Sequence, residues 1–175
     1  MVLDDPTDTE FWQRWGGVHS CTPLYYPAFL DRFPNAVCAV LAAITNAEPG
    51  GVLVHCASGR DRTGLIVLAL LAALGVSAED IADDYALSHD RRAEQCAALG
   101  LDDDTPKIRA FLAARGTTER ALITELVNGP DFADRLRAGG LDDAGLAALR
   151  ARVLHADRSA ARPLRTVRWP GRDGP

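Results

Sequence analysis

The chain has 175 residues, of which 47% are hydrophobic, and a formal net charge of −5. This length is typical of a single domain, and the hydrophobic content is sufficient for a packed core. The negative charge excludes a general nucleic-acid-binding protein, because no basic face dominates the sequence.

The four cysteines are irregularly spaced and form no C-x-x-C pair: Cys21, Cys38, Cys56 and Cys96. A zinc ribbon or a disulfide framework is therefore not indicated, and free thiols predict a reducing compartment. No apolar run is long enough to cross a bilayer, and the acidic N-terminus lacks the features of an export signal. We therefore expect a cytoplasmic protein without stable membrane insertion.

Residues 1–33 show no sustained hydrophobic period and are rich in turn residues and aromatic rings. These rings could line a pocket or pack as a lid over the core. From Asn35 the apolar spacing becomes helical, until a Pro-Gly-Gly sequence at residues 49–51 interrupts it. The successive apolar residues of 52–55 then predict a central strand that is covered on both faces.

Helices are predicted for most of the remaining chain, at residues 63–74, 77–91, 105–116 and 117–127 and in the segment up to 154. A single strand cannot make a sheet. Either further strands lie within residues 1–33, or the chain lacks strands that its fold expects.

The sequence HCASGRDRTG occupies residues 55–64, between the predicted strand and the next helix. A thiol at a helix N-terminus beside an arginine has a lowered pKa, so Cys56 is the expected nucleophile. The five residues between Cys56 and Arg62 can wrap into a loop whose N–H groups bind phosphate. Arg62 offers a planar fork for two phosphate oxygens. The pattern predicts hydrolysis of a phosphate ester through a phosphocysteine.

The other loop residues have supporting roles. His55 is expected to orient the loop through hydrogen bonds. Asp61 is the expected proton donor, and its alternative role is to pair with a neighbouring arginine; Asp31 is the second candidate acid. The residues predicted to bind the substrate are Ala57, Ser58, Gly59, Arg60, Thr63 and Gly64. Among them, Gly59 permits a turn that other residues resist, and Thr63 can donate its hydroxyl to the Cys56 sulfur.

Two acidic clusters, at residues 83–84 and 102–104, are paired carboxylates that could suggest a metal site. Neither has a nearby histidine or the spacing of a calcium loop. We therefore interpret both clusters as solvated surface, and we expect neither a metal nor another cofactor.

Residues 55–64 resemble the loop H-C-x-x-G-K-D-R-T-G of the cysteine-dependent protein-tyrosine phosphatase superfamily, in its bacterial dual- or triple-specificity type. The resemblance extends over about residues 20–154, including Asp-Tyr-Ala-Leu-Ser at 84–88. It implies that Asp61 is the acid and that the substrate is phosphotyrosine, often also phosphoserine, phosphothreonine or a phosphoinositide. The lysine of the family loop is Arg60 here, a larger and forked cation.

The resemblance implies an α/β fold of the protein-tyrosine-phosphatase kind. In it, a central strand leads into the phosphate loop, and the C-terminal half is largely helical. The family also has sheet strands that end ahead of the point at which this chain begins, so we expect these N-terminal strands to be missing. The predicted domain is residues 1–155, incomplete at its N-terminus relative to the family, and residues 156–175 form a basic tail predicted to be disordered.

We therefore predict a tyrosine or dual-specificity phosphatase that acts on a phosphorylated protein or a phosphoinositide, without nucleic acid as a partner. One alternative is a phosphate-binding pseudophosphatase with weak or no turnover. Another is a sulfur-transfer or arsenate-reducing thiol enzyme, although no resolving cysteine lies near Cys56 in the sequence.

Overall fold

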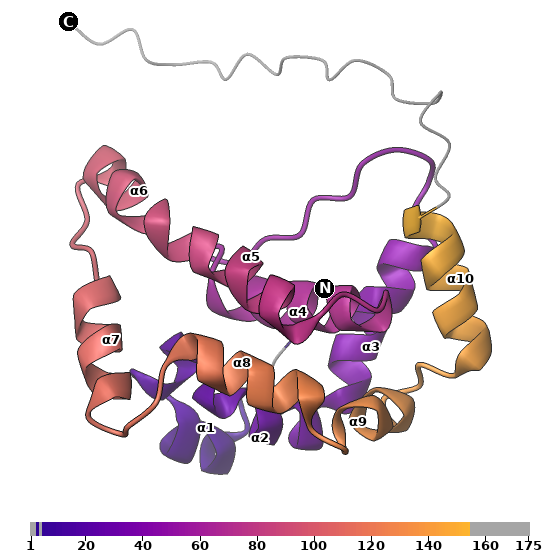
Figure 1. Ribbon diagram of the computed structural model, residues 1–175, viewed down its shortest axis with the longest axis horizontal. Helices are drawn as coiled ribbons and strands as arrows, with labels where there is room; N and C mark the ends of the chain where they lie inside the picture. The colour runs from indigo at the N-terminus through magenta and orange to yellow at the C-terminus, as the bar shows by residue number, and fades with distance from the viewer. Residues whose placement is uncertain (1–2, 4, 155–175) are drawn as a thin grey trace, which may run out of the picture.

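The computed structural model describes residue 3 and residues 5–154, and all regular structure in this part of the chain is helical (Figure 1). The first half contains α1 (Thr9–Trp15), η1 (His19–Cys21), η2 (Pro23–Tyr25), α2 (Tyr26–Arg32), α3 (Pro34–Thr45) and α4 (Asp61–Ala73). The second half contains α5 (Ala78–Asp90), α6 (Arg92–Leu99), α7 (Thr105–Ala113), α8 (Glu119–Asn128), α9 (Phe132–Ala138) and α10 (Asp143–Leu154).

Local sequence explains where several of these helices begin. The Ser77 side chain accepts a hydrogen bond from the backbone N–H of Asp80, at 3.1 Å, and so caps α5. Thr118 caps α8 in the same way, by accepting from the N–H of Ala121 at 3.2 Å. Proline stands in the first turn of α2, α3 and α7, where its missing N–H costs no helical hydrogen bond.

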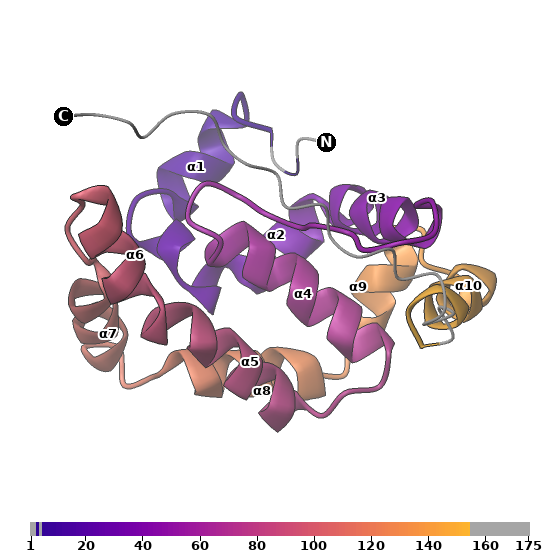
Figure 2. The same cartoon turned by 90° about the horizontal axis from the view of Figure 1, so that it is seen from above.

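Helix α4 lies at the centre of the arrangement. Figure 2 shows it between α2 and α3 on one side and α5 and α8 on the other, with α9 and α10 beyond its C-terminal end. The side chains of α4 are apolar on every face of the helix. The helix can therefore be buried against several neighbours at once. The sequence predicts a buried helix here, because the residues of 63–74 are apolar all round, and this prediction is confirmed.

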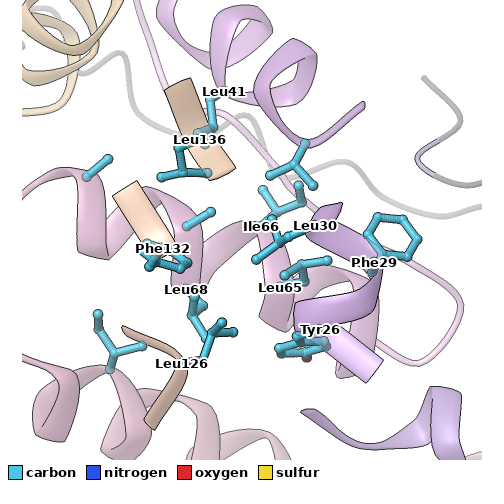
Figure 3. Packing of buried hydrophobic residues seen from close by; sticks show 14 of the residues in the cluster. Tyr26, Phe29, Leu30, Leu41, Leu65, Ile66, Leu68, Leu126, Phe132 and Leu136 are labelled. Carbon is cyan, nitrogen blue, oxygen red and sulfur yellow. The ribbon is translucent and has the colours of Figure 1, made fainter. Parts of the chain in front are cut away.

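The hydrophobic core is built around the apolar residues of α4. Leu65 is fully buried and Leu68 is 1% exposed. Figure 3 shows them among side chains from α2, α3, α8 and α9, namely Tyr26, Phe29, Leu30, Leu41, Leu126, Phe132 and Leu136. This packing fixes the position of the N-terminal end of α4, which follows Cys56 in the chain.

The predicted α/β fold is wrong for the described residues. Residues 51–56 have no regular secondary structure, and no strand is present among the described residues to pair with them. Leu53 among them is 85% exposed. A strand needs a hydrogen-bonded neighbour, so apolar composition alone does not make one.

The N-terminal part of the chain also differs from expectation. Residues 1–33, predicted to hold loops or missed strands, contain α1, α2 and two short 3₁₀ helices instead. Phe11, Tyr25, Tyr26 and Phe29 are buried there, so these rings are part of the core. Helix α6 was not predicted. The predicted tail at 156–175 lies outside the described residues.

No single helix among the described residues is long and apolar enough to span a membrane. Residues 23–32 and 34–45 pass that test only as a pair, and their two segments meet at 94°. Many of the large apolar side chains of both segments, including Leu30 and Leu41, are buried in the core.

Candidate active site

The HCASGRDRTG segment joins the extended residues 51–56 to the first turn of α4. Gly59 has φ +67°, in the left-handed region that glycine adopts without strain. The backbone N–H of Gly64 donates to the carbonyl of Arg60 at 2.6 Å and closes the first helical turn. The chain therefore turns sharply between Cys56 and Asp61, as the glycine predicts, and the N-terminus of α4 faces this turn.

Cys56 is half-buried, and its pKa is below that of an ordinary thiol. Burial by itself raises this pKa, but the hydroxyl and backbone N–H of Thr63 and the N–H groups of Gly59 and Ser58 lower it by more. The Thr63 hydroxyl oxygen is buried and has no ordinary hydrogen-bond partner among the described residues, which leaves it available to the sulfur. The loop thus favours the thiolate at Cys56.

We expect Cys56 to be alkylated at a lower pH than Cys21 and Cys38, because its pKa is lowered. The reacting species is the thiolate, so a lower pKa moves half-maximal alkylation to a lower pH. Burial raises the pKa of Cys21 and Cys38, which should react only at higher pH. Iodoacetamide labelling across a pH series, read by peptide mass spectrometry, measures the order. Labelling of Cys21 before Cys56 would contradict the assignment.

Cys56 and Arg62 line the same cavity, of about 540 Å³. His55 and Thr63 also line it, together with apolar residues of α3, of α4 and of residues 52–54. Arg62 is exposed on the first turn of α4. The nucleophile and the cation that sequence reasoning paired are thus brought to one cavity.

A second cavity, of about 550 Å³, lies between α4 and α5 on the other side of Thr63. Ser58, Gly59 and Gly64 contribute to its wall. Ala57 is exposed. The predicted substrate-binding residues that line a cavity therefore all line this second one, whereas Cys56 and Arg62 line the first, and Thr63 is common to both.

Asp61 is the first residue of α4 and is 8% exposed. Burial raises its pKa by more than the neighbouring Arg60 guanidinium lowers it, so the net pKa is above that of an ordinary aspartate. The Tyr26 hydroxyl donates to the backbone carbonyl of Asp61 at 2.7 Å. A buried carboxyl with a raised pKa is suited to carrying a proton.

Arg60 is 2% exposed and is held between two carboxylates. Its Nε donates to Asp61, and its two terminal nitrogens donate to Asp104, at 3.0 and 3.3 Å. The sequence indicated an ion pair between Asp61 and a neighbouring arginine as an alternative, and this pair is present. Asp104 was not predicted, because 44 residues separate it from Arg60 and only the fold brings the two together.

Gly64 allows two tyrosine rings to approach the first turn of α4. A Cβ at this position would lie 2.5 Å from a ring carbon of Tyr85 and 3.1 Å from the Tyr26 hydroxyl. We therefore expect Gly64→Ala to lower the free energy of unfolding by about 1–2 kcal/mol, because the overpacking outweighs the better helix propensity of alanine. Urea unfolding followed by circular dichroism measures this change.

Gly145 in α10 is the matched control for that substitution, since it is also helical. A Cβ there meets only the far end of the Asp142 side chain, at 3.3 Å, and the side chain of Leu141. Gly145→Ala should leave stability unchanged or raise it by about 0.5–1 kcal/mol. Equal effects of the two substitutions would show that the tyrosine rings yield to the added methyl group.

The second candidate acid, Asp31, and the acidic cluster at residues 83–84 lie elsewhere. Asp31, on α2, pairs with Arg135 at 2.6 Å and is exposed. Asp83 pairs with Arg120 on the surface. Within the described residues, no group of three or more His, Cys, Asp or Glu side chains could hold a metal ion.

The sequence profile of the tyrosine phosphatase family matches residues 13–155. A protein of Cupriavidus necator that carries the name tyrosine-protein phosphatase is 37% identical over 83 residues, which cover 44% of this chain and 30% of that protein. A tyrosine-protein phosphatase of Nostoc commune is 35% identical over 78 residues, or 39% of this chain and 26% of that protein. The aligned regions thus span less than a third of either relative. No solved structure is significantly similar to the chain.

Proposed function

Because this chain belongs to the tyrosine phosphatase family, we propose that it hydrolyses phosphomonoesters through a phosphocysteine at Cys56. The observation that carries the proposal is the thiol itself. It stands before the N-terminus of α4, its pKa is lowered by the loop, and it shares a cavity with Arg62. A thiolate beside a cation and a set of backbone N–H groups is the arrangement that attack on a phosphate ester requires.

In the first step, the Cys56 sulfur attacks phosphorus while the bond from phosphorus to the ester oxygen breaks. Asp61 gives its proton to the departing oxygen. The loop N–H groups and Arg62 hold the other phosphate oxygens as their charge changes. The products are a phosphocysteine and a neutral alcohol or phenol.

In the second step, water attacks the phosphocysteine and the phosphorus–sulfur bond breaks. The Asp61 carboxylate, now ionised, takes a proton from the attacking water. The Thr63 hydroxyl is close enough to influence the sulfur and can donate to the departing thiolate. Inorganic phosphate leaves, and both Cys56 and Asp61 regain their starting protonation states.

The substrate that we propose is a phosphorylated protein, with phosphotyrosine first and phosphoserine or phosphothreonine also accepted. A phosphoinositide is less well supported, because the Arg60 side chain is buried between carboxylates and does not present a free cation at the surface. A cytoplasmic location stays a prediction; it agrees with four cysteines that are all free thiols.

The test is turnover of p-nitrophenyl phosphate by the folded chain, combined with an acid quench after mixing with a ³²P-labelled phosphotyrosyl peptide. We expect phosphate release and an acid-stable label on the peptide that contains Cys56. Release without a label on Cys56 would contradict the phosphocysteine. No release from a folded chain would favour a module that binds phosphorylated partners without turnover.

A further inference from the structure

The guanidinium of Arg60 divides its donors unequally between two carboxylates. Its two terminal nitrogens form a fork on Asp104, at 3.0 and 3.3 Å. Only Nε remains for Asp61, and it is shared between the two carboxylate oxygens at 3.2 and 3.4 Å. The geometry that makes the strongest pair, two parallel N–H···O bonds, is therefore given to Asp104.

Asp104 is itself held from a second side. Arg92 of α6 donates through its Nε to Asp104 Oδ1 at 3.4 Å. Asp104 immediately precedes α7, so this carboxylate joins the phosphate loop to α6 and α7. Its pKa is below that of an ordinary aspartate, mainly because it accepts the hydrogen bonds of Arg60, so it is ionised at neutral pH.

We propose that Asp104 is a positioning residue for the reaction: it draws the fork of Arg60 away from Asp61 and so leaves Asp61 able to carry the leaving-group proton. This inference rests on the proposed function. Without Asp104, Arg60 could turn its fork onto Asp61, and a carboxylate paired in this way ionises more readily. An ionised Asp61 cannot serve as the proton donor at neutral pH.

The other groups around Asp61 are compatible with this role. Tyr26 of α2 donates to the backbone carbonyl of Asp61 and not to its carboxylate. Tyr85 of α5 and Cys21 of η1 also interact electrostatically with Asp61, and each of them is neutral because its own pKa is raised. Of the charged side chains near Asp61, Arg60 lowers its pKa and Asp104 raises it.

The main test is the pH dependence of phenyl phosphate hydrolysis by the wild-type chain and Asp104→Asn. Activity should fall at high pH as Asp61 loses its proton. We expect this basic limb to move to lower pH by roughly 0.5–1 unit in Asp104→Asn, because the pKa of Asp61 falls when Arg60 is released. Asp102→Asn removes the same charge from an exposed neighbour, and its basic limb should stay in place.

A second readout does not depend on turnover. In a Cys56→Ser background with ¹³C-labelled aspartate, the carboxyl shift of Asp61, assigned against Asp61→Asn, reports its titration directly. The midpoint should move down in Asp104→Asn and stay in place in Asp102→Asn. A wild-type chain that does not hydrolyse the ester would refute the proposed function, whereas an unmoved midpoint would refute the role of Asp104.

If Asp104→Asn does not fold, as judged by circular dichroism, Arg92→Gln tests the same idea with the opposite sign. Arg92 competes with Arg60 for Asp104. Removal of Arg92 should strengthen the ion pair between Asp104 and Arg60. The basic limb of the activity profile and the titration midpoint of Asp61 should then both move to higher pH. A shift to lower pH, or no shift, in this variant would overturn the inference.

Discussion

Cys56→Ser should lower kcat for p-nitrophenyl phosphate by roughly 10³-fold or more, which corresponds to at least about 4 kcal/mol of transition-state stabilisation. The hydroxyl of serine has nearly the shape of the thiol but does not ionise near neutral pH, so the loop can no longer supply an anionic nucleophile. Phosphate binding should persist, because the loop N–H groups and Arg62 are unchanged. Steady-state hydrolysis together with equilibrium binding of phosphate measures both properties.

Cys38→Ser is the matched control for that substitution. The Cys38 thiol is buried in α3 and donates to the carbonyl of Leu136 at 3.2 Å, a bond that a serine hydroxyl can also make. Its kcat should remain within a few-fold of wild type. Hydrolysis that survives in Cys56→Ser and is lost in Cys38→Ser would place the nucleophile elsewhere.

Asp61→Asn should have an effect that depends on the leaving group. General acid catalysis contributes typically 10²–10⁴-fold, and it matters most when the departing oxygen is strongly basic. We expect a loss of about 10²-fold or more for phenyl phosphate and about 10-fold or less for p-nitrophenyl phosphate, whose phenolate leaves without a proton. Comparison of kcat over a series of substituted phenyl phosphates measures the difference.

Asp31→Asn is the control for Asp61→Asn, because Asp31 is the second candidate acid in the sequence. Asp31 pairs with Arg135 on the surface, and the loss of an exposed ion pair costs little. Its kcat should not change with the leaving group. If Asp61→Asn slows both esters equally, Asp61 acts through its pairing with Arg60 and does not donate the proton.

Local rules were sufficient for those parts of the chain whose conformation depends on near neighbours. The capping serine before α5 and the prolines in α3 and α7 mark helix starts that the structure contains. The apolar run of α4 predicted a buried helix, and Gly59 predicted a turn. The order of residues from Cys56 to Thr63 indicated an anion-binding loop, because N–H groups at a helix N-terminus are a local feature.

The tertiary structure decided everything that depends on a partner distant in the sequence. Residues 52–55 have the composition of a strand, yet they are not one, because a strand exists only where another chain segment completes its hydrogen bonds. The sequence places Asp61 before Asp31 as the candidate acid, but only the fold shows that burial raises the pKa of Asp61 and that an arginine on α9 pairs with Asp31.

Asp104 is the clearest case of a residue whose role depends on a partner distant in the sequence. Its sequence context, three consecutive aspartates, is typical of solvated surface, yet Asp104 is half-buried and forms an ion pair with a buried arginine. The fold places it against Arg60, 44 residues away, in a fork of two hydrogen bonds. Sequence patterns report which atoms are available, whereas packing determines which charges meet and how much water remains between them.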